Sequence, residues 1–259
     1  MTLTHIPEDM TATVDAPVTL AALQTELARR GQWVPVDPPG APTLRELLDA
    51  NASGPRRYAF GTVRDHVLGL RVRLADGRLI RCGGNVVKNV AGYDLCRLFV
   101  GARGALGEIT EVTFKLRPLP EKEAIVQRQC GSLREAGQVV DTVLASAVTP
   151  VVLDLVAPAT VVVGFAGTGA EVAWQLEQLG WSEPATLDYN QPLPRRVSVL
   201  PSRLIDTLET LGAETFVSRA GNGSIHYRGG SAPPPPELPA ALFERLKAAF
   251  DPTRQLPAL

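Results

Sequence analysis

Hydrophobic and polar residues follow regular spacings along the first part of the chain. The segment 11–16 alternates between the two classes, which predicts a short strand, and leucines recur at helical spacing from Leu20 to Leu27. Thr19 is a residue type that begins a helix, and Gly31 is one that ends it. The same criteria predict a short helix over 45–50, strands over 67–74, 79–82 and 109–116, and a helical segment over 94–100.

The strands over 67–74 and 79–82 are joined by the sequence Ala-Asp-Gly-Arg at 75–78. An Asp-Gly pair readily adopts the positive φ angles of a tight hairpin turn. We therefore expect the second strand to return beside the first.

After Pro120, predicted strands and helices alternate, which indicates a separate α+β layer. A run of prolines within 231–236 predicts a stiff linker. Beyond it, Leu242, Leu246 and Phe250 mark one last amphipathic helix. The elements expected between Pro120 and the linker are strands over 121–129, 151–155 and 160–165, and helices over 133–145 and 170–179.

Composition narrows the class of protein. The chain has 259 residues, enough for one large domain or two small ones, and its 26 basic and 27 acidic residues give a net charge of −1. Without an excess of positive charge, we expect no nucleic-acid partner. No signal sequence and no uncharged apolar stretch of membrane-spanning length is visible, so the expected location is cytoplasmic, without direct membrane insertion.

Cysteine and histidine spacing predicts no metal site. The three cysteines are too scattered for a disulfide framework or a zinc cluster, and they fit a reducing compartment. We interpret Cys82 and Cys96 as small buried hydrophobic residues. The three histidines likewise share no metal-ligand spacing.

Two glycine patterns raise the question of nucleotide binding. The pattern Gly164–Gly169 has the spacing G-x-x-G-x-G, whereas a dinucleotide fingerprint needs G-x-G-x-x-G, so a plain turn from strand to helix is favoured. The pattern Gly101–Gly107 lets the backbone pass close to a flat partner. That partner is either a ligand or another strand of the protein, and spacing alone leaves both open.

The segment 42–120 contains two distinctive motifs, VVKNVAGYDL and LFVGARGALGEITEVTFKL. It resembles the second half of the FAD-binding domain of the vanillyl-alcohol-oxidase-type (PCMH) flavoproteins. Within that superfamily it is most similar to the FAD-binding E-type subunit of glycolate oxidase. The fold class implied is α+β, with the second lobe of a PCMH-type FAD-binding domain and a ferredoxin-like α+β cap domain.

The resemblance also implies domain boundaries. Residues 1–120 would form the C-terminal lobe of the FAD-binding domain, and 121–230 the cap. Residues 231–259 would form the linker and a helix that returns to the FAD domain. The family's earlier lobe has a glycine-rich loop for the cofactor's pyrophosphate, and nothing before Thr19 has that composition.

The implied function is oxidation of glycolate, or a similar small 2-hydroxy acid, to the 2-oxo acid with FAD as cofactor. In that chemistry the flavin carries the redox step and the protein supplies orientation and electrostatics. The implied partners are a second flavin subunit and an iron–sulfur subunit, through which the complex could associate with a membrane.

Matched residue by residue, nine positions fall on segments that approach the flavin. Small residues suit these places because the main chain must lie close to the cofactor. The rival interpretation is that these glycines only shape the lobe. The nine candidate cofactor-binding residues are Ala52, Ser53, Gly54, Gly61, Val63, Asp65, Gly107, Glu108 and Ile109.

The chain also departs from the family pattern. Leu44, Arg45 and Glu46 stand where the family has a glycine pair, and Ala102 and Ala105 replace hydroxyl residues. These departures motivate an alternative function, a flavin-free structural or assembly subunit of the same complex. A free-standing nicotinamide enzyme built on Gly164–Gly169 is a weaker third hypothesis.

No catalytic base is assigned from the sequence. Lys88, Tyr93 and Asp94 are polar residues in the first distinctive motif. Tyr93 and Asp94 instead fit a role in hydrogen bonding at a junction between loop and helix.

Overall fold

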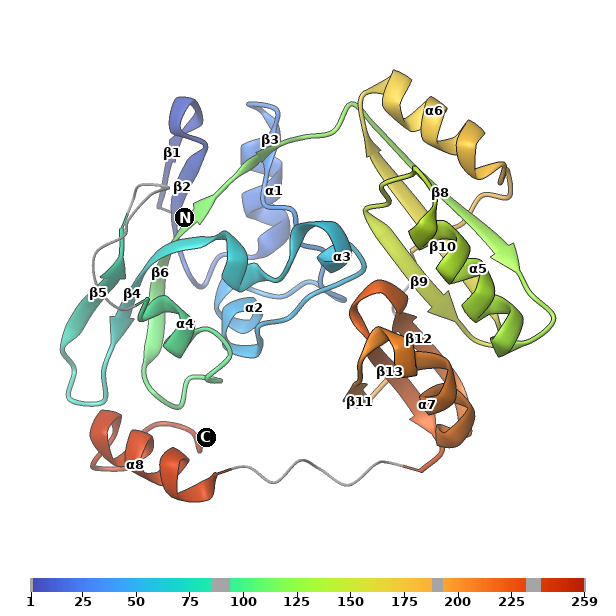
Figure 1. Cartoon of the computed structure of the whole chain (residues 1–259). Helices are drawn as coiled ribbons and strands as arrows, with labels where there is room; N and C mark the ends of the chain where they lie inside the picture. The colour runs from blue at the N-terminus through green and yellow to red at the C-terminus, as the bar shows by residue number, and fades with distance from the viewer. Residues whose placement is uncertain (1, 85–93, 188–192, 232–238, 259) are drawn as a thin grey trace. The chain divides into compact units, whose positions relative to one another are not determined.

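The computed structural model describes residues 2–84, 94–187, 193–231 and 239–258, and the chain divides into two compact units (Figure 1). Unit 1 comprises Met1–Gly54, Gly61–Leu119 and Glu237–Leu259, and unit 2 comprises Pro55–Phe60 and Pro120–Pro236. Each unit has its own hydrophobic core.

Unit 1 is built on a five-stranded antiparallel sheet of order β1-β2-β6-β4-β5. A short pair of strands, β3 and β7, lies apart from it. The strands are β1 (Leu3–Ile6), β2 (Thr11–Asp15), β3 (Gln32–Trp33), β4 (Val67–Arg73), β5 (Leu79–Gly83), β6 (Glu108–Lys115) and β7 (Arg117–Pro118). The helices are α1 (Leu20–Ala28), α2 (Leu44–Ala50), α4 (Cys96–Phe99) and α8 (Ala240–Phe250), with short 3-10 turns η1 (Pro7–Asp9) and η2 (Val63–His66).

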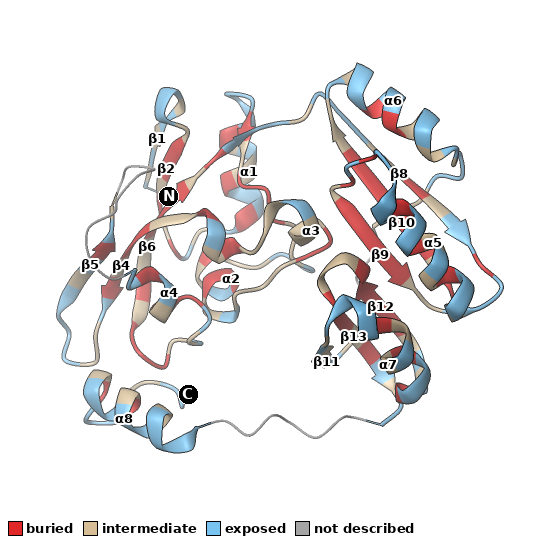
Figure 2. Cartoon of the chain, viewed as in Figure 1, coloured by how far each residue is buried: buried red, intermediate tan, exposed pale blue. Residues whose placement is uncertain are grey.

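Local chemistry explains where the helices of unit 1 begin. The Thr19 hydroxyl accepts a hydrogen bond from the Ala22 amide at 3.2 Å and so caps α1. Thr43 and Glu46 form a reciprocal capping box at the start of α2. The leucines of both helices are buried in the core of unit 1, and Figure 2 marks parts of both helices as buried. The predicted strands and helices of this region, and the hairpin at Gly77, are confirmed.

The last helix forms as predicted, but its buried anchor is different. Leu242, expected on the apolar face, is 50% exposed, whereas Lys247 is buried. The Lys247 ammonium lies 2.8 Å from the Asp251 carboxylate and donates a hydrogen bond to the Ala105 carbonyl at 2.9 Å. The Phe250 ring meets a core ring of α4 edge-on, with centroids 5.8 Å apart. A charge satisfied by carbonyls thus holds α8 on unit 1.

Unit 2 contains a six-stranded antiparallel sheet of order β11-β13-β12-β9-β10-β8. Its strands are β8 (Lys122–Gln129), β9 (Val152–Val156), β10 (Thr160–Gly167), β11 (Arg195–Ser198), β12 (Ala213–Arg219) and β13 (Ser224–Gly229). Its helices are α3 (Arg57–Phe60), α5 (Leu133–Ala145), α6 (Gly169–Leu179) and α7 (Leu204–Leu211), with 3-10 turns η3 (Pro201–Arg203) and η4 (Ala220–Asn222).

The first half of unit 2 follows a β-α-β-β-α-β path. After α6, the chain returns beside β8 through an isolated antiparallel bridge between Val126 and Pro184. The Gln127 amide donates to the Glu183 carbonyl at 2.9 Å in the same pairing. This order is that of a ferredoxin-like fold, and the α+β class is confirmed. The second half, from β11 to β13 with α7, extends the sheet and has no counterpart among the predicted elements.

Candidate functional site

Helix α2 brings together the three segments that the sequence assigns to a cofactor. Its Leu48 carbonyl accepts a hydrogen bond from the Gly101 amide at 2.9 Å, and its Asp49 carbonyl accepts one from the Arg103 amide at 3.0 Å. The Arg64 guanidinium of η2 donates to the Val100 carbonyl at 2.6 Å. The turn after α2, the loop around η2 and the glycine-rich loop before β6 therefore form one cluster.

Arg45 links α2 directly to the start of β6. Its Nε donates a hydrogen bond to the Ile109 carbonyl at 3.1 Å, and its Nη1 lies 2.6 Å from the Glu108 carboxylate. A second guanidinium, from Arg73 on β4, lies 3.0 Å from the same carboxylate. Arg45 thus donates to the main-chain carbonyl of Ile109, one of the predicted cofactor-binding residues.

A surface hollow of about 450 Å³ lies beside this ion pair. Its rim carries two guanidinium groups and two carboxylates, so it is polar and charged. The lining residues are Asp15, Pro17, Val18, Arg45, Arg73, Glu108 and Thr110. Of the two arginines, Arg73 is the one that could pair with an anionic group of a ligand, because guanidinium groups bind phosphates and carboxylates in a fork geometry.

The predicted glycines are packed against the chain itself. A Cβ added at Gly54 would collide with the Asp37 main chain, and one added at Gly61 would lie 2.6 Å from the Asp65 carboxylate. A Cβ added at Gly107 would be 2.5 Å from the Val72 side chain. Internal packing therefore accounts for these glycines, which supports the interpretation that they shape the lobe.

The two apolar candidates point into the core. Val63 and Ile109 are 0% and 1% exposed, so only their main chains are available to a ligand. Ala52 is half-buried, and its amide donates to the Leu47 carbonyl at 3.0 Å at the end of α2. Ser53 follows it in the same turn and is also half-buried.

Asp65 serves a structural interaction in η2. Its carboxylate accepts hydrogen bonds from the Thr62 amide at 2.8 Å and the Thr62 hydroxyl at 3.0 Å. Burial raises the pKa of Asp65, but these hydrogen bonds more than offset it, and the pKa lies below its ordinary value. The carboxylate is therefore ionised at neutral pH and caps this turn.

Three polar groups that the sequence did not single out lie in the same cluster. Within the described residues, Asp49 Oδ1, Asn51 Oδ1 and Arg64 Nε are buried and have no hydrogen-bond partner. Burial raises the pKa of Asp49, while the nearby Arg45 guanidinium lowers it and Glu108 raises it. No spacing in the sequence signals these groups, because they meet only through tertiary packing.

The remaining motif residues either lie outside the described residues or make ordinary structural contacts. Lys88 and Tyr93 lie outside the described residues, whereas Asp94 is exposed and pairs with Arg97 at 2.9 Å beside α4. The glycine pattern of unit 2 is a turn from β10 into α6, where the Glu171 carboxylate accepts the Thr168 amide at 2.8 Å. That helix start is occupied by its own capping box.

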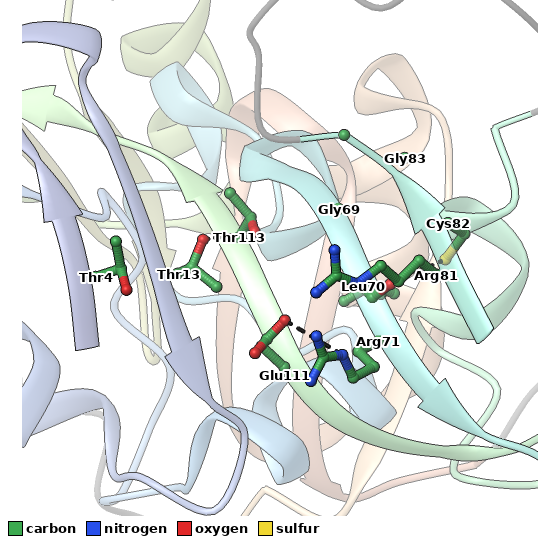
Figure 3. A pocket seen from close by; sticks show the side chains of 11 residues that line it. Thr4, Thr13, Gly69, Leu70, Arg71, Arg81, Cys82, Gly83, Glu111 and Thr113 are labelled. Atoms are coloured by element: carbon green, nitrogen blue, oxygen red, sulfur yellow. Dashed lines mark hydrogen bonds and ion pairs between the residues drawn. The ribbon is translucent and has the colours of Figure 1, made fainter. Parts of the chain in front are cut away.

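A second hollow of about 510 Å³ lies on the face of the unit 1 sheet opposite the core (Figure 3). Arg71 and Glu111 approach to 3.6 Å across β4 and β6, and the hydroxyls of Thr13 and Thr113 are 2.8 Å apart. Arg81 is the cross-strand neighbour of Arg71. The hollow is lined mainly by strand residues and includes none of the nine predicted cofactor residues.

These contacts decide how a flavin could fit. At the predicted residues, Arg45 donates to the Ile109 carbonyl, and Gly54, Gly61 and Gly107 lie against internal partners. A cofactor atom at the Ile109 carbonyl would therefore compete with the Arg45 guanidinium. The assignment of the nine candidate residues to the cofactor stays a prediction.

Comparison with known proteins identifies the type of domain. A family described as "FAD binding domain" matches residues 2–83. The prediction of FAD as the cofactor type is confirmed by this match. Among the described residues, no helix combines the length and the apolar character needed to cross a membrane.

Curated relatives match part of the chain. Glycolate oxidase subunit GlcD of Bacillus subtilis is 37% identical over 158 residues, which is 60% of this chain and 34% of the relative. Glycolate oxidase subunit GlcE of Escherichia coli is 39% identical over 133 residues, 50% of this chain and 38% of the relative. A probable mitochondrial D-lactate dehydrogenase of Danio rerio is 41% identical over 117 residues, 44% and 24% of the two chains. The matches thus span 24–38% of the length of these relatives.

A solved structure shares the fold over nearly the whole chain. Alkyldihydroxyacetonephosphate synthase superposes with a TM-score of 0.70 at 16% identity, covering 97% of this chain and 63% of that one. At this identity the likeness concerns the fold alone. It supports the α+β PCMH-type fold class predicted from the sequence.

Proposed function

We propose that the chain is an FAD-binding subunit of a complex that oxidises glycolate, or a similar small 2-hydroxy acid, to the 2-oxo acid. The match of residues 2–83 to an FAD binding domain carries the proposal. Two glycolate oxidase subunits and a D-lactate dehydrogenase among the relatives support the substrate class. The E-type assignment and an iron–sulfur partner are part of the same proposal.

The chain's own residues would contribute position and charge. FAD, when bound, accepts the electrons removed from the hydroxy acid. Arg73 borders the hollow next to the predicted segments and would pair with an anionic group there. The capping of η2 by Asp65 and the hydrogen bonds from α2 to the glycine-rich loop keep the surrounding main chain in place.

One observation favours a second function, the flavin-free structural subunit. Arg45 donates to the Ile109 carbonyl and pairs with Glu108, so these two predicted cofactor residues have partners without a ligand. In this alternative the chain would stabilise its partner subunits, and they alone would hold the flavin.

Reconstitution of the complex with and without this chain separates the two functions. Flavin released by denaturation would be counted per complex, and glycolate- and D-lactate-dependent dye reduction would be measured on the same samples. The FAD-subunit proposal predicts one additional FAD when the chain is present. An unchanged flavin count, together with partners that dissociate without the chain, would establish the structural function instead.

A further inference from the structure

Two cysteine thiols meet at the edge of the unit 1 core. Cys82 lies on the edge strand β5 and Cys96 begins α4, and their sulfur atoms are 3.6 Å apart. Both side chains are buried, and the Cys82 thiol also lies 3.8 Å from the Leu70 carbonyl. The sequence interpretation of two unrelated small hydrophobic residues misses this pairing, because 13 residues separate them in the chain.

The backbone beside the pair leaves room for the sulfur atoms to approach. Gly83 follows Cys82 with a φ of +72°, and a Cβ added there would lie 2.9 Å from the Cys96 sulfur. A residue with a side chain would therefore occupy the space next to that sulfur. A disulfide needs an S–S distance of about 2.05 Å, so the sulfurs must move together by roughly 1.5 Å from their separation in the structure.

The two thiols are also chemically unequal. The hydrogen bond from Cys96 lowers the pKa of Cys82, whereas the same hydrogen bond and burial raise the pKa of Cys96. Burial and the Asp94 carboxylate act against ionisation of Cys82, but the net shift is downward. Cys82 is thus the sulfur that ionises first, and Cys96 keeps a proton for the second step.

A metal site is a poorer explanation of the pair. Among the described residues, no group of three or more His, Cys, Asp or Glu side chains is placed to hold a metal ion. Two thiolates without further ligands fall short of the four ligands that structural zinc requires. Oxidation of the dithiol needs no third residue.

We propose that Cys82 and Cys96 are a redox modification site that forms an intramolecular disulfide when the protein meets hydrogen peroxide. The Cys82 thiolate attacks one peroxide oxygen, the O–O bond breaks, and the other oxygen leaves as water after taking up a proton. The Cys82 sulfenic acid then reacts with the Cys96 thiol, which forms the S–S bond and releases a second water. Two thiols and one peroxide thereby give one disulfide and two waters.

The chain offers its own control thiol. Cys130 lies in unit 2, is also buried, and has a pKa raised chiefly by burial. No cysteine partner lies near it in the described structure, which holds only the three free thiols named here. We expect peroxide to oxidise the pair at least about tenfold faster than Cys130.

Mass spectrometry of the peroxide-treated full chain tests the proposal. Arg81, Lys88 and Arg97 place the two cysteines in separate tryptic peptides, 82–88 and 89–97. The expected product has lost the mass of two hydrogen atoms, links these peptides in a digest without reductant, and keeps a free thiol on Cys130. Dithiothreitol should restore three thiols.

Serine variants show which two cysteines form the disulfide. Cys82→Ser and Cys96→Ser should each abolish the loss of two hydrogens, whereas Cys130→Ser should leave it intact. Linkage through Cys130, or equal oxidation rates for all three cysteines, would overturn the proposal. Peptide mapping uses the chain without substitutions. The linked cysteines can therefore be identified even if a serine variant fails to fold. Because it needs neither flavin nor partners, its outcome is independent of the proposed function.

Discussion

The two units each contain an Arg–carboxylate pair whose nearest atoms are 2.6 Å apart, in opposite environments. In unit 1 about a third of the Arg45 and Glu108 side chains is exposed, whereas in unit 2 Arg219 and Asp154 are 7% and 1% exposed. A partly exposed pair contributes little and can separate, but a buried pair cannot lose one partner without leaving a desolvated charge. The Arg45–Glu108 pair can therefore separate and expose the Ile109 carbonyl to a ligand. The Arg219–Asp154 pair is a fixed part of the core of unit 2.

The largest expected effect comes from the buried pair. Replacing Arg219 with Leu removes the guanidinium that lies 2.6 Å from the Asp154 carboxylate, which stays buried without this counter-charge. The free energy of unfolding should fall by about 3–5 kcal/mol, measured by urea denaturation. The control is Arg203→Ala, an exposed arginine of the same unit. A loss no greater than in that control would show that the pair is not structural.

The anchor of α8 should rank next. In Lys247→Met the Asp251 carboxylate loses its ammonium partner and the Ala105 carbonyl loses a donor. We expect α8 to detach, so limited proteolysis should remove the C-terminal segment, while Arg245→Met, on the exposed face, resists cleavage. Equal resistance of both variants would contradict the anchoring role.

The Lys247–Asp251 pair also predicts that the attachment of α8 depends on pH. Burial raises the pKa of Asp251, but hydrogen bonds from Lys247, Gln255 and Leu256 hold it below the ordinary value. A carboxylate with a depressed folded pKa stabilises above its unfolded pKa, and that stability is lost as pH falls through the folded pKa. Release of α8 should therefore begin in acid below the ordinary Asp pKa of 3.8.

His226 gives a smaller and separable effect in unit 2. Burial, and then the charges of Arg219, Arg196 and Arg57, lower its pKa from 6.5 to about 4. The unfolded chain binds a proton on this histidine first, so stability should fall by roughly 2 kcal/mol as pH drops from about 6.5 towards 4. In His226→Gln the denaturation midpoint should depend much less on pH over this range. An unchanged pH dependence would show that His226 is not its source.

The smallest effect on stability is expected at the exposed pair. Arg45→Ala removes the contacts to Glu108 and Ile109, yet should cost no more than about 1 kcal/mol of unfolding free energy. Glu108 keeps Arg73 as a partner at 3.0 Å. A loss as large as that of Arg219→Leu would mean that Arg45 is part of the core structure.

Periodicity predicted most elements because their burial follows local spacing. Leu20, Leu23 and Leu27 of α1 are all buried, as the helical pattern requires. The elements from β11 to β13 were not predicted, since their short segments are placed by pairing with β9 in the tertiary fold. At α8 a buried Lys247 replaced the expected Leu242, because its partners are carbonyls distant in sequence.

The candidate site was only partly accessible from sequence. The nine residues came from a family resemblance, and Arg45 was visible as a departure from it. Its pairing with Glu108 across 63 residues, and the packing of Gly107 on Val72, are tertiary facts that no spacing encodes. The same glycine spacing is compatible with a nearby ligand and with a neighbouring strand. The contact between Gly107 and Val72, which favours the strand, is visible only in the folded structure.

FAD titration of the reconstituted complex tests most directly whether Arg45 competes with FAD for the Ile109 carbonyl. The complex would contain either the unmodified chain or Arg45→Ala. The matched control is Arg29→Ala, at the exposed arginine that directly follows α1. Removal of the competing contacts to β6 should tighten FAD binding about threefold to tenfold, with no change in the control. Equal or weaker FAD binding by Arg45→Ala would contradict the account, because the guanidinium would then hold the cofactor or lie away from it.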